Sequence, residues 1–238
     1  MQRKWRTIFD LLTKLLHLEP TKATSNDDLC RIGRRGDDEI SVTFPEKTDI
    51  ITPMKRYTLL AIALHWITAL LVISGFALGV TMVDISGFTP TKLRYFSWHK
   101  WLGITVLGLA CVRLLWRLTH PAPPYSQKMP RWQHRAASAV HAALYGLIFA
   151  VPVSGYLYSL AAGVPVVYLG LIPLPALIDP HPEWKLLLKQ LHYWLNMLLL
   201  ACVSLHVAAA LKHQFIDRDG LLTRMLPRSR AQTNERLE

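Results

Sequence analysis

The sequence is organised around LLLKQLHYWLNMLLLACVSLHVAAALKH, residues 186–213. From Gln190 to Leu211 this stretch has no Asp, Glu, Lys or Arg, and its length suits a helix that crosses the hydrocarbon core of a bilayer. His192 and His206 interrupt the apolar run fourteen residues apart. At about 100° and about 1.5 Å per residue, the two imidazoles point from one helix face and lie about 21 Å apart along the axis. One helix would thus present an imidazole near each membrane surface.

Other uncharged runs predict further membrane spans. Tyr57 to Val83 and Ala136 to Ile178 contain no charged residue, and apolar runs of this length are typical of transmembrane helices. A less clear span lies between them, and Gly163 to Pro182 is a proline-rich loop that lies against the surface or partly re-enters the membrane. The sequence therefore predicts an all-α integral membrane four-helix bundle, with spans at about 57–83, 92–118, 136–162 and 186–213.

The charge pattern favours a membrane over nucleic acid as the partner of this basic chain. There are 27 Lys and Arg against 16 Asp and Glu, a formal net charge of +11. The basic residues cluster beside the ends of apolar spans, as in cytoplasmic loops, and no zinc-ligand spacing or basic aromatic repeat indicates nucleic-acid binding. Lys55, Arg56, the connection after Arg113 and the C-terminal tail are more basic than the opposite side. Both termini are therefore expected in the cytoplasm.

The two ends of the chain differ in composition from the four-span domain, which we place at residues 54–230. Residues 1–53 contain a basic amphipathic pattern, Trp5 to Leu18, followed by a polar segment typical of a linker or of disorder. Because Met54 is followed by a basic start and then a span, an alternative is that Met54 is the natural start. Residues 231–238 form a polar tail.

Histidines inside the spans are the candidate functional residues, because an ionisable side chain in a membrane is costly. With both termini in the cytoplasm, His65 and His206 lie about two turns from the cytoplasmic ends of their spans, whereas His99 and His192 lie near the opposite surface. Depth therefore pairs His65 with His206 and His99 with His192. Each pair could hold one haem iron through two neutral imidazoles, an arrangement suited to electron transfer. Zinc is a weaker alternative, because His192 and His206 are too far apart to share one ion.

Several other polar residues are secondary candidates. His141 lies at a depth close to that of His65 and is the main competitor for ligation, although we favour a supporting role. His213 lies two turns beyond His206 and is a candidate quinone or substrate contact. Anionic haem propionates need cations, for which the sequence offers Arg56, Arg113 and Arg117 on the cytoplasmic side and Arg94, Lys100 and Lys189 on the other.

From about Met54 to Arg230 the sequence resembles the bacterial di-haem cytochrome b561 family. The segments that carry the resemblance are YTLLAIALHW (57–66), WHKWLGITVLGL (98–109), RLLWRLTHPAPP (113–124), HAALYGLIFAVPVSG (141–155), LKQLHYWLN (188–196) and LHVAAALKHQFIDRDGLLTRMLP (205–227). The resemblance implies two haem b groups in a four-helix bundle, with ligation by His65, His99, His192 and His206. Residues 1–53 lie outside the family pattern.

The resemblance also implies electron transfer between a donor and ubiquinone in the bacterial inner membrane. Some family members are similar to superoxide oxidases, which pass an electron from superoxide at the outer surface to ubiquinone. A basic rim of Arg94, Lys100 and Lys189 would attract that anion. Two alternatives stay open: a haem-bearing membrane-anchor subunit that accepts electrons from a dehydrogenase or hydrogenase, and a non-redox transporter or assembly factor.

Overall fold

The fold was analysed in a computed structural model, which describes residues 56–120, 123 and 130–226. The amphipathic segment and linker expected in residues 1–53, and the polar tail, lie outside the described residues. Within them the chain forms four long helices, each long and apolar enough to cross a membrane: α2 (Leu59–Asp84), α3 (Pro90–Thr119), α4 (Arg131–Ala161) and α5 (Pro182–Lys212). The predicted four spans are thus present, and the arrangement is consistent with a four-helix bundle.

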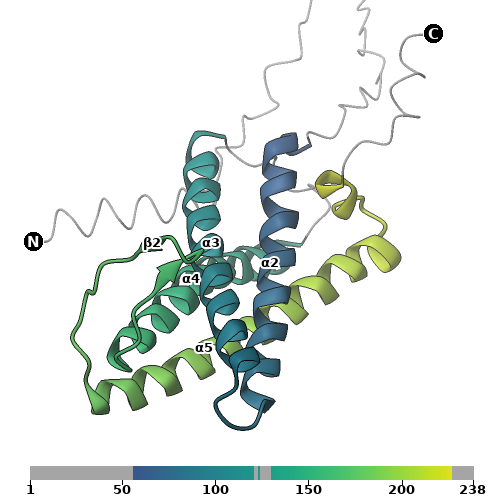
Figure 1. Cartoon of the computed structure of the whole chain (residues 1–238). Coiled ribbons are helices and arrows are strands. Elements are labelled where there is room, and N and C mark those ends of the chain that lie inside the picture. The colour runs from purple at the N-terminus through teal and green to yellow at the C-terminus, as the bar shows by residue number, and fades with distance from the viewer. Residues whose placement is uncertain (1–55, 121–122, 124–129, 227–238) are drawn as a thin grey trace, which may run out of the picture. The chain divides into compact units, whose positions relative to one another are not determined.

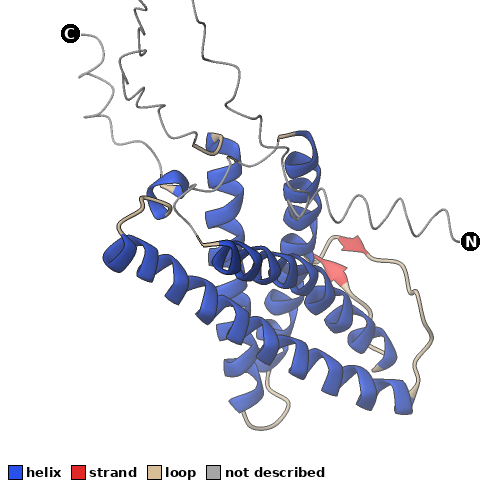
Figure 2. Ribbon diagram, turned by 180° about the vertical axis from the view of Figure 1, so that it is seen from behind, coloured by secondary structure: helices blue, strands red, loops and turns tan. Residues whose placement is uncertain are grey.

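The helices form two antiparallel pairs that cross obliquely (Figures 1 and 2). α2 packs mainly on α3 and α4 packs mainly on α5, while contacts between α3 and α4 join the two pairs. The backbone of α5 does not approach that of α2 or α3 in the same close way. Side chains from α5 therefore reach the first pair of helices across a wider interhelical space.

The helices begin at capping or helix-initiating residues, and not at the positions where the charge-free runs of the sequence begin. The Thr58 hydroxyl accepts a hydrogen bond from the Ala61 N–H at 3.2 Å, and the Thr89 hydroxyl accepts one from Lys92 at 3.1 Å. α4 begins at Arg131, earlier than the predicted start near residue 136, and α5 begins at Pro182 rather than 186. Both helices extend through charged residues, because absence of charge marks the hydrocarbon-embedded part of a helix and not its full length.

The loop between α4 and α5 contains a short antiparallel hairpin that the sequence did not predict. β1 (Val167–Tyr168) pairs with β2 (Ile172–Pro173), and the turn places Leu169 and Gly170 at positive φ angles of 53° and 73°. Trp101 of α3 donates its indole N–H to the Val167 carbonyl at 2.8 Å. The hairpin is therefore tied to the side of α3.

The chain after α5 folds back towards α2. α5 continues into a single π-helical turn, η2 (His213–Asp217), and Arg218 then adopts a left-handed conformation with φ 50°. A short 3₁₀ helix, η3 (Leu222–Met225), follows, and the Trp66 indole of α2 donates to the Met225 carbonyl at 2.8 Å. This return places the C-terminal segment beside the end of α2 that carries His65.

Candidate functional site

His65 of α2 and His206 of α5 form the first histidine pair. Their ring centroids lie 6.3 Å apart, with ring planes at 73°. The His65 Nδ1 atom is buried and has no hydrogen-bond partner within the described part of the chain. The backbones of α2 and α5 do not pack closely, yet the imidazoles of His65 and His206 lie next to each other between these two helices.

His99 of α3 and His192 of α5 form the second pair, with ring centroids 6.2 Å apart and ring planes at 90°. His99 Nδ1 lies 2.9 Å from the carbonyl oxygen of Gly75 on α2. His192 Nδ1 lies 3.1 Å from the Val151 carbonyl oxygen and 3.0 Å from the hydroxyl of Ser154, both on α4. A carbonyl oxygen can only accept, so each Nδ1 carries the proton, and each Nε2 keeps a lone pair for a metal.

A glycine makes room for each ring of the second pair. A Cβ atom on Gly79 would lie 3.3 Å from His99 Cε1, and a Cβ atom on Gly155 would lie 2.9 Å from His192 Cε1. In both cases the glycine follows the accepting carbonyl by four residues, so the two groups lie on the same face of one helix, one turn apart. In each case the neighbouring helix therefore supplies both a surface without a Cβ atom, on which the ring lies, and a carbonyl that accepts from Nδ1–H. We call this arrangement the seat of the histidine.

The spacing of both pairs suits an iron ion held between two imidazoles. A metal–imidazole bond is about 2 Å long, and the ring nitrogen lies about 1 Å from the ring centre, so two coaxial ligands place their centroids about 6 Å apart. Both observed separations agree with this value. The spacing of the residues present therefore fits two bis-histidine haems, one for each pair.

His141 of α4 also reaches the first pair, and its ring centroid lies 5.3 Å from that of His206. This separation is shorter than two imidazoles on opposite sides of a metal require. Arg113 of α3 interacts electrostatically with His65, His141 and His206, and its guanidinium lies 5.2 Å from the centre of the Tyr145 ring. His141 and Arg113 therefore surround the first pair without replacing either of its members.

The remaining predicted cations lie near the helix ends. Arg56 is exposed before the start of α2, and Arg117 is half-buried in the last turn of α3. Lys100 follows His99 directly on α3 and is half-buried, whereas Arg94 and Lys189 are exposed. Within the part of the chain that the structure describes, no hydrogen bond or ion pair joins any of these five side chains to a histidine of its pair, and their role towards propionates stays a prediction.

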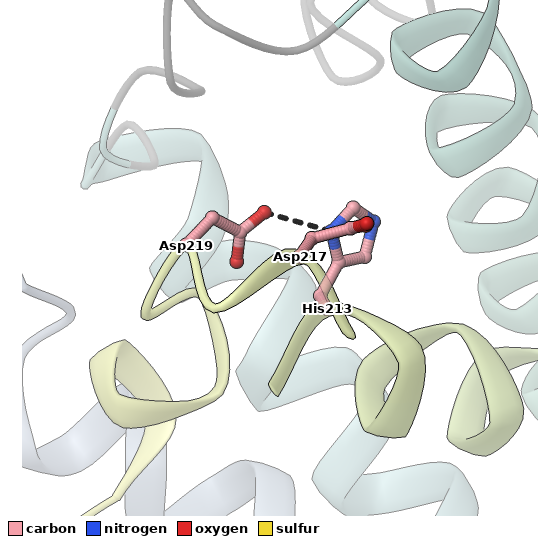
Figure 3. Close-up of side chains that lie close together, drawn as sticks. All are labelled: His213, Asp217 and Asp219. Atoms are coloured by element: carbon pink, nitrogen blue, oxygen red, sulfur yellow. Dashed lines mark hydrogen bonds and ion pairs between the residues drawn. The ribbon is translucent and has the colours of Figure 1, made fainter. Parts of the chain in front are cut away.

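His213 lies apart from both pairs, in the π-helical turn after α5. Its Nδ1 is 2.7 Å from Asp219 Oδ2 and 3.1 Å from Asp217 Oδ2 (Figure 3), while Asp217 also pairs with Lys212 at 2.5 Å. The carboxylates therefore fix the orientation of the imidazole through Nδ1 and leave Nε2 as its second proton-exchanging nitrogen. Next to it, an open hollow of about 360 Å³ is lined by Gln214, Phe215, Arg218 and Gly220.

Sequence reasoning found the four paired histidines but missed the groups that hold the second pair. Ser154 is only 4% exposed and contacts His192, yet an isolated serine in an apolar helix has no distinctive pattern. Gly75 and Gly79 form a GxxxG motif, which is usually associated with close helix–helix packing. The position of a histidine on the neighbouring helix was the missing information.

Comparison with known proteins gives a consistent family. The family model described as prokaryotic cytochrome b561 matches residues 56–228. Two similar proteins are from Escherichia coli strain K12: cytochrome b561 homolog 2, 36% identical over 175 residues, and cytochrome b561 homolog 1, 33% identical over 180 residues. A third, named probable superoxide oxidase CybB, is from Yersinia pestis and is 31% identical over 186 residues. The matches cover 74% of this chain and 93%, 99% and 98% of the three relatives.

The match to the family model includes all four long helices and both histidine pairs. The matches agree with the electron-transport character and the haem that the sequence predicted. The chain therefore belongs to the prokaryotic cytochrome b561 family, a family of multi-pass membrane cytochromes that carry haem b.

Proposed function

We propose that this protein holds two haem b groups, one between His65 and His206 and one between His99 and His192. The observation that carries this proposal is the presence of two imidazole pairs at 6.3 and 6.2 Å, both bridging α5 to the α2–α3 pair. A bis-histidine haem supplies a one-electron carrier with no open coordination position. The protein itself contributes the spacing of both pairs and the imidazole tautomers of His99 and His192.

The two centres lie at different membrane depths, with His65 and His206 towards the cytoplasm. The basic residues after Arg113 and in the C-terminal tail support this orientation, because cytoplasmic loops are enriched in Lys and Arg. Both termini are then cytoplasmic, in the bacterial inner membrane. Electrons would cross the bilayer between the two centres along α5, the helix shared by both.

At the outer surface we propose superoxide as the electron donor. Lys100 follows His99 directly and is half-buried, and the exposed Arg94 and Lys189 precede His99 and His192 on the same helices, so the outer ends of α3 and α5 carry cations that favour the approach of a small anion. The name of the Yersinia pestis relative, probable superoxide oxidase, supports the same donor. Two superoxide anions each lose one electron and become O₂, and the two electrons with two protons convert ubiquinone to ubiquinol.

At the cytoplasmic end we propose that the quinone ring binds in the hollow beside His213. Gln214 and Arg218 line this hollow with polar groups, and Phe215 lines it with an apolar surface. The Gln214 Oε1 atom is buried and has no partner within the described part of the chain, so it is available to accept from a quinol hydroxyl. Asp219 holds His213 Nδ1, which orients Nε2 to exchange the proton that quinone reduction requires.

Haem stoichiometry in histidine variants tests the two centres. His65→Ala and His206→Ala should each lose the same haem, and His99→Ala and His192→Ala should each lose the other. His141→Ala is the matched control, because this imidazole contacts His206 but lies too close to be the opposing ligand. It should keep both haems. Loss of both haems in every single variant, or retention of both, would contradict the assignment.

Activity measurements distinguish the donor. Purified protein with two haems should reduce ubiquinone when superoxide is generated enzymatically, with two superoxide anions consumed per quinol. A haem-loaded protein that reacts with neither superoxide nor quinol would count against the proposal. Co-purification with a large dehydrogenase or hydrogenase subunit would favour the membrane-anchor function, and a folded colourless protein would favour a non-redox function.

A further inference from the structure

The Nδ1 atoms of the two histidine pairs have different environments. His99 Nδ1 donates to the Gly75 carbonyl at 2.9 Å, and His192 Nδ1 has two acceptors, the Val151 carbonyl and the Ser154 hydroxyl. By contrast, His65 Nδ1 has no hydrogen-bond partner within the described part of the chain. The two centres therefore differ in the groups behind their ligands, although their ring separations are nearly equal.

Ser154 can act only as an acceptor towards His192. Its hydroxyl lies 2.8 Å from the Val151 carbonyl and donates its hydrogen there, so the oxygen turns a lone pair to Nδ1–H. Ser154 is 4% exposed, so water does not compete for this contact. Val151, Ser154 and the His192 ring form a closed three-member hydrogen-bonded arrangement on α4 and α5.

Hydrogen bonds at Nδ1–H increase the electron density that an imidazole gives to a metal through Nε2. A more basic ligand stabilises ferric over ferrous haem and lowers the reduction potential. We infer that Ser154 is a positioning residue that lowers the potential of the haem held by His99 and His192, so that this centre is the lower-potential member of the two. The inference rests on the proposed haem ligation and deepens it by giving the direction of favourable electron flow.

The charge distribution acts in the same direction. Arg113 interacts electrostatically with His65 and His206, and a nearby cation favours the reduced, less positive state of a metal centre. The hydrogen-bond acceptors at Nδ1 lower the reduction potential of the His99–His192 centre, and the Arg113 cation raises that of the His65–His206 centre. Both effects therefore increase the difference between the two potentials. An electron that enters at the His99–His192 centre moves downhill to the His65–His206 centre.

Redox potentiometry of Ser154→Ala tests the inference, and a His65→Ala background simplifies it by leaving only the haem of interest. In Ser154→Ala the Val151 carbonyl still accepts from His192 Nδ1–H, so only the Ser154 contact is lost, and the ferric-to-ferrous ratio should change by about twofold to at most tenfold at a fixed potential. Tenfold corresponds to about 59 mV for a one-electron couple. The midpoint potential should rise by up to that amount.

Ser138→Ala is the matched control, because Ser138 is also a buried serine of α4. It should leave both potentials unchanged. Ser154→Cys keeps the size of the side chain but replaces a good acceptor with a weak one, and it should shift the potential in the same direction as Ser154→Ala. An unchanged or lowered potential of the His99–His192 haem in both Ser154 variants would overturn the inference, whereas a protein that binds no haem would overturn the proposed function instead.

Discussion

Gly155 is the position at which a single methyl group should disturb one haem and spare the other. A Cβ atom there would lie 2.9 Å from Cε1 and 3.2 Å from Nδ1 of His192. Ordinary contacts between such atoms begin at about 3.4 Å, so in Gly155→Ala the ring must retreat from α4 by about 0.5 Å, a displacement at the limit of what a functional site tolerates.

That displacement acts on the hydrogen bonds as well as on the packing. His192 Nδ1 already lies 3.0 and 3.1 Å from its two acceptors, and about 0.5 Å more would leave both contacts too long to be hydrogen bonds. Overpacking of a closed site costs about 1–3 kcal/mol. Since about 1.4 kcal/mol is a factor of ten, haem retention at the His99–His192 centre should fall by about fivefold to a hundredfold.

Two other glycines provide comparison variants in which the expected steric effect is smaller or absent. A Cβ atom on Gly79 would lie 3.3 Å from His99 Cε1, a contact that needs a shift of only a few tenths of an ångström, and one on Gly146 would meet nothing within 4 Å. All three glycines are inside helices, so each replacement gains the same helix propensity of about 1 kcal/mol. Pyridine haemochrome assays and ferric spectra should therefore rank the losses as Gly155→Ala, then Gly79→Ala, then Gly146→Ala with none. If Gly155→Ala kept two haems with unaltered spectra, the seat beneath His192 would have no role in ligation.

Three further predictions concern other parts of the protein. Asp219→Asn removes the nearer of the two carboxylates that orient His213, so quinone reduction should slow by about tenfold while haem content stays constant; Asp84→Asn is the control, and equal rates in both variants would contradict a role of the Asp219 contact in proton transfer. The ring planes of the two pairs are near perpendicular, at 73° and 90°, so both ferric haems should give strongly anisotropic low-spin electron paramagnetic resonance signals, and a rhombic signal typical of parallel planes would contradict the ring geometry. Tyr168→Phe removes a hydrogen bond of 2.9 Å to the Thr105 hydroxyl, and it should lower the free energy of unfolding by about 1 kcal/mol in thermal unfolding of the haem-loaded protein, without loss of haem.

The membrane helices were predictable because the hydrocarbon core imposes a length and a composition that can be counted. Charge-free runs located three of the four helices, and α3 was placed less clearly in the interval between two of them. The runs put the start of α4 near residue 136 rather than at Arg131, since a helix continues where its charged residues meet the interface. The hairpin at Val167–Pro173 was not predictable, because two-residue strands carry no alternating pattern and depend on a tertiary bond from Trp101.

The histidine pairs were predictable for a similar reason. Depth in a membrane is one coordinate that sequence position gives directly, and two residues fourteen apart on a helix differ in depth by a known rise. Depth does not give direction around the helix axis. His141 lies at nearly the same depth as His65, and only the ring separations of 5.3 and 6.3 Å from His206 distinguish the two.

The seats for His99 and His192 show how a packing motif can be used for ligand orientation. GxxxG normally lets two helix backbones approach closely, and Gly75 and Gly79 do lie on α2 where it packs against α3. Here the space left by Gly79 receives the His99 imidazole, and the carbonyl of Gly75, one turn earlier, accepts its Nδ1–H.

Val151 and Gly155 repeat the arrangement for His192 on a different helix, with valine in place of the first glycine. The requirement is therefore a helical carbonyl whose second lone pair can accept from Nδ1–H at one position and no Cβ four residues later, which turns Nδ1 towards the supporting helix. A pattern of this kind, opposite a membrane histidine at matching depth, is a sequence feature that predicts the orientation of the imidazole as well as its position.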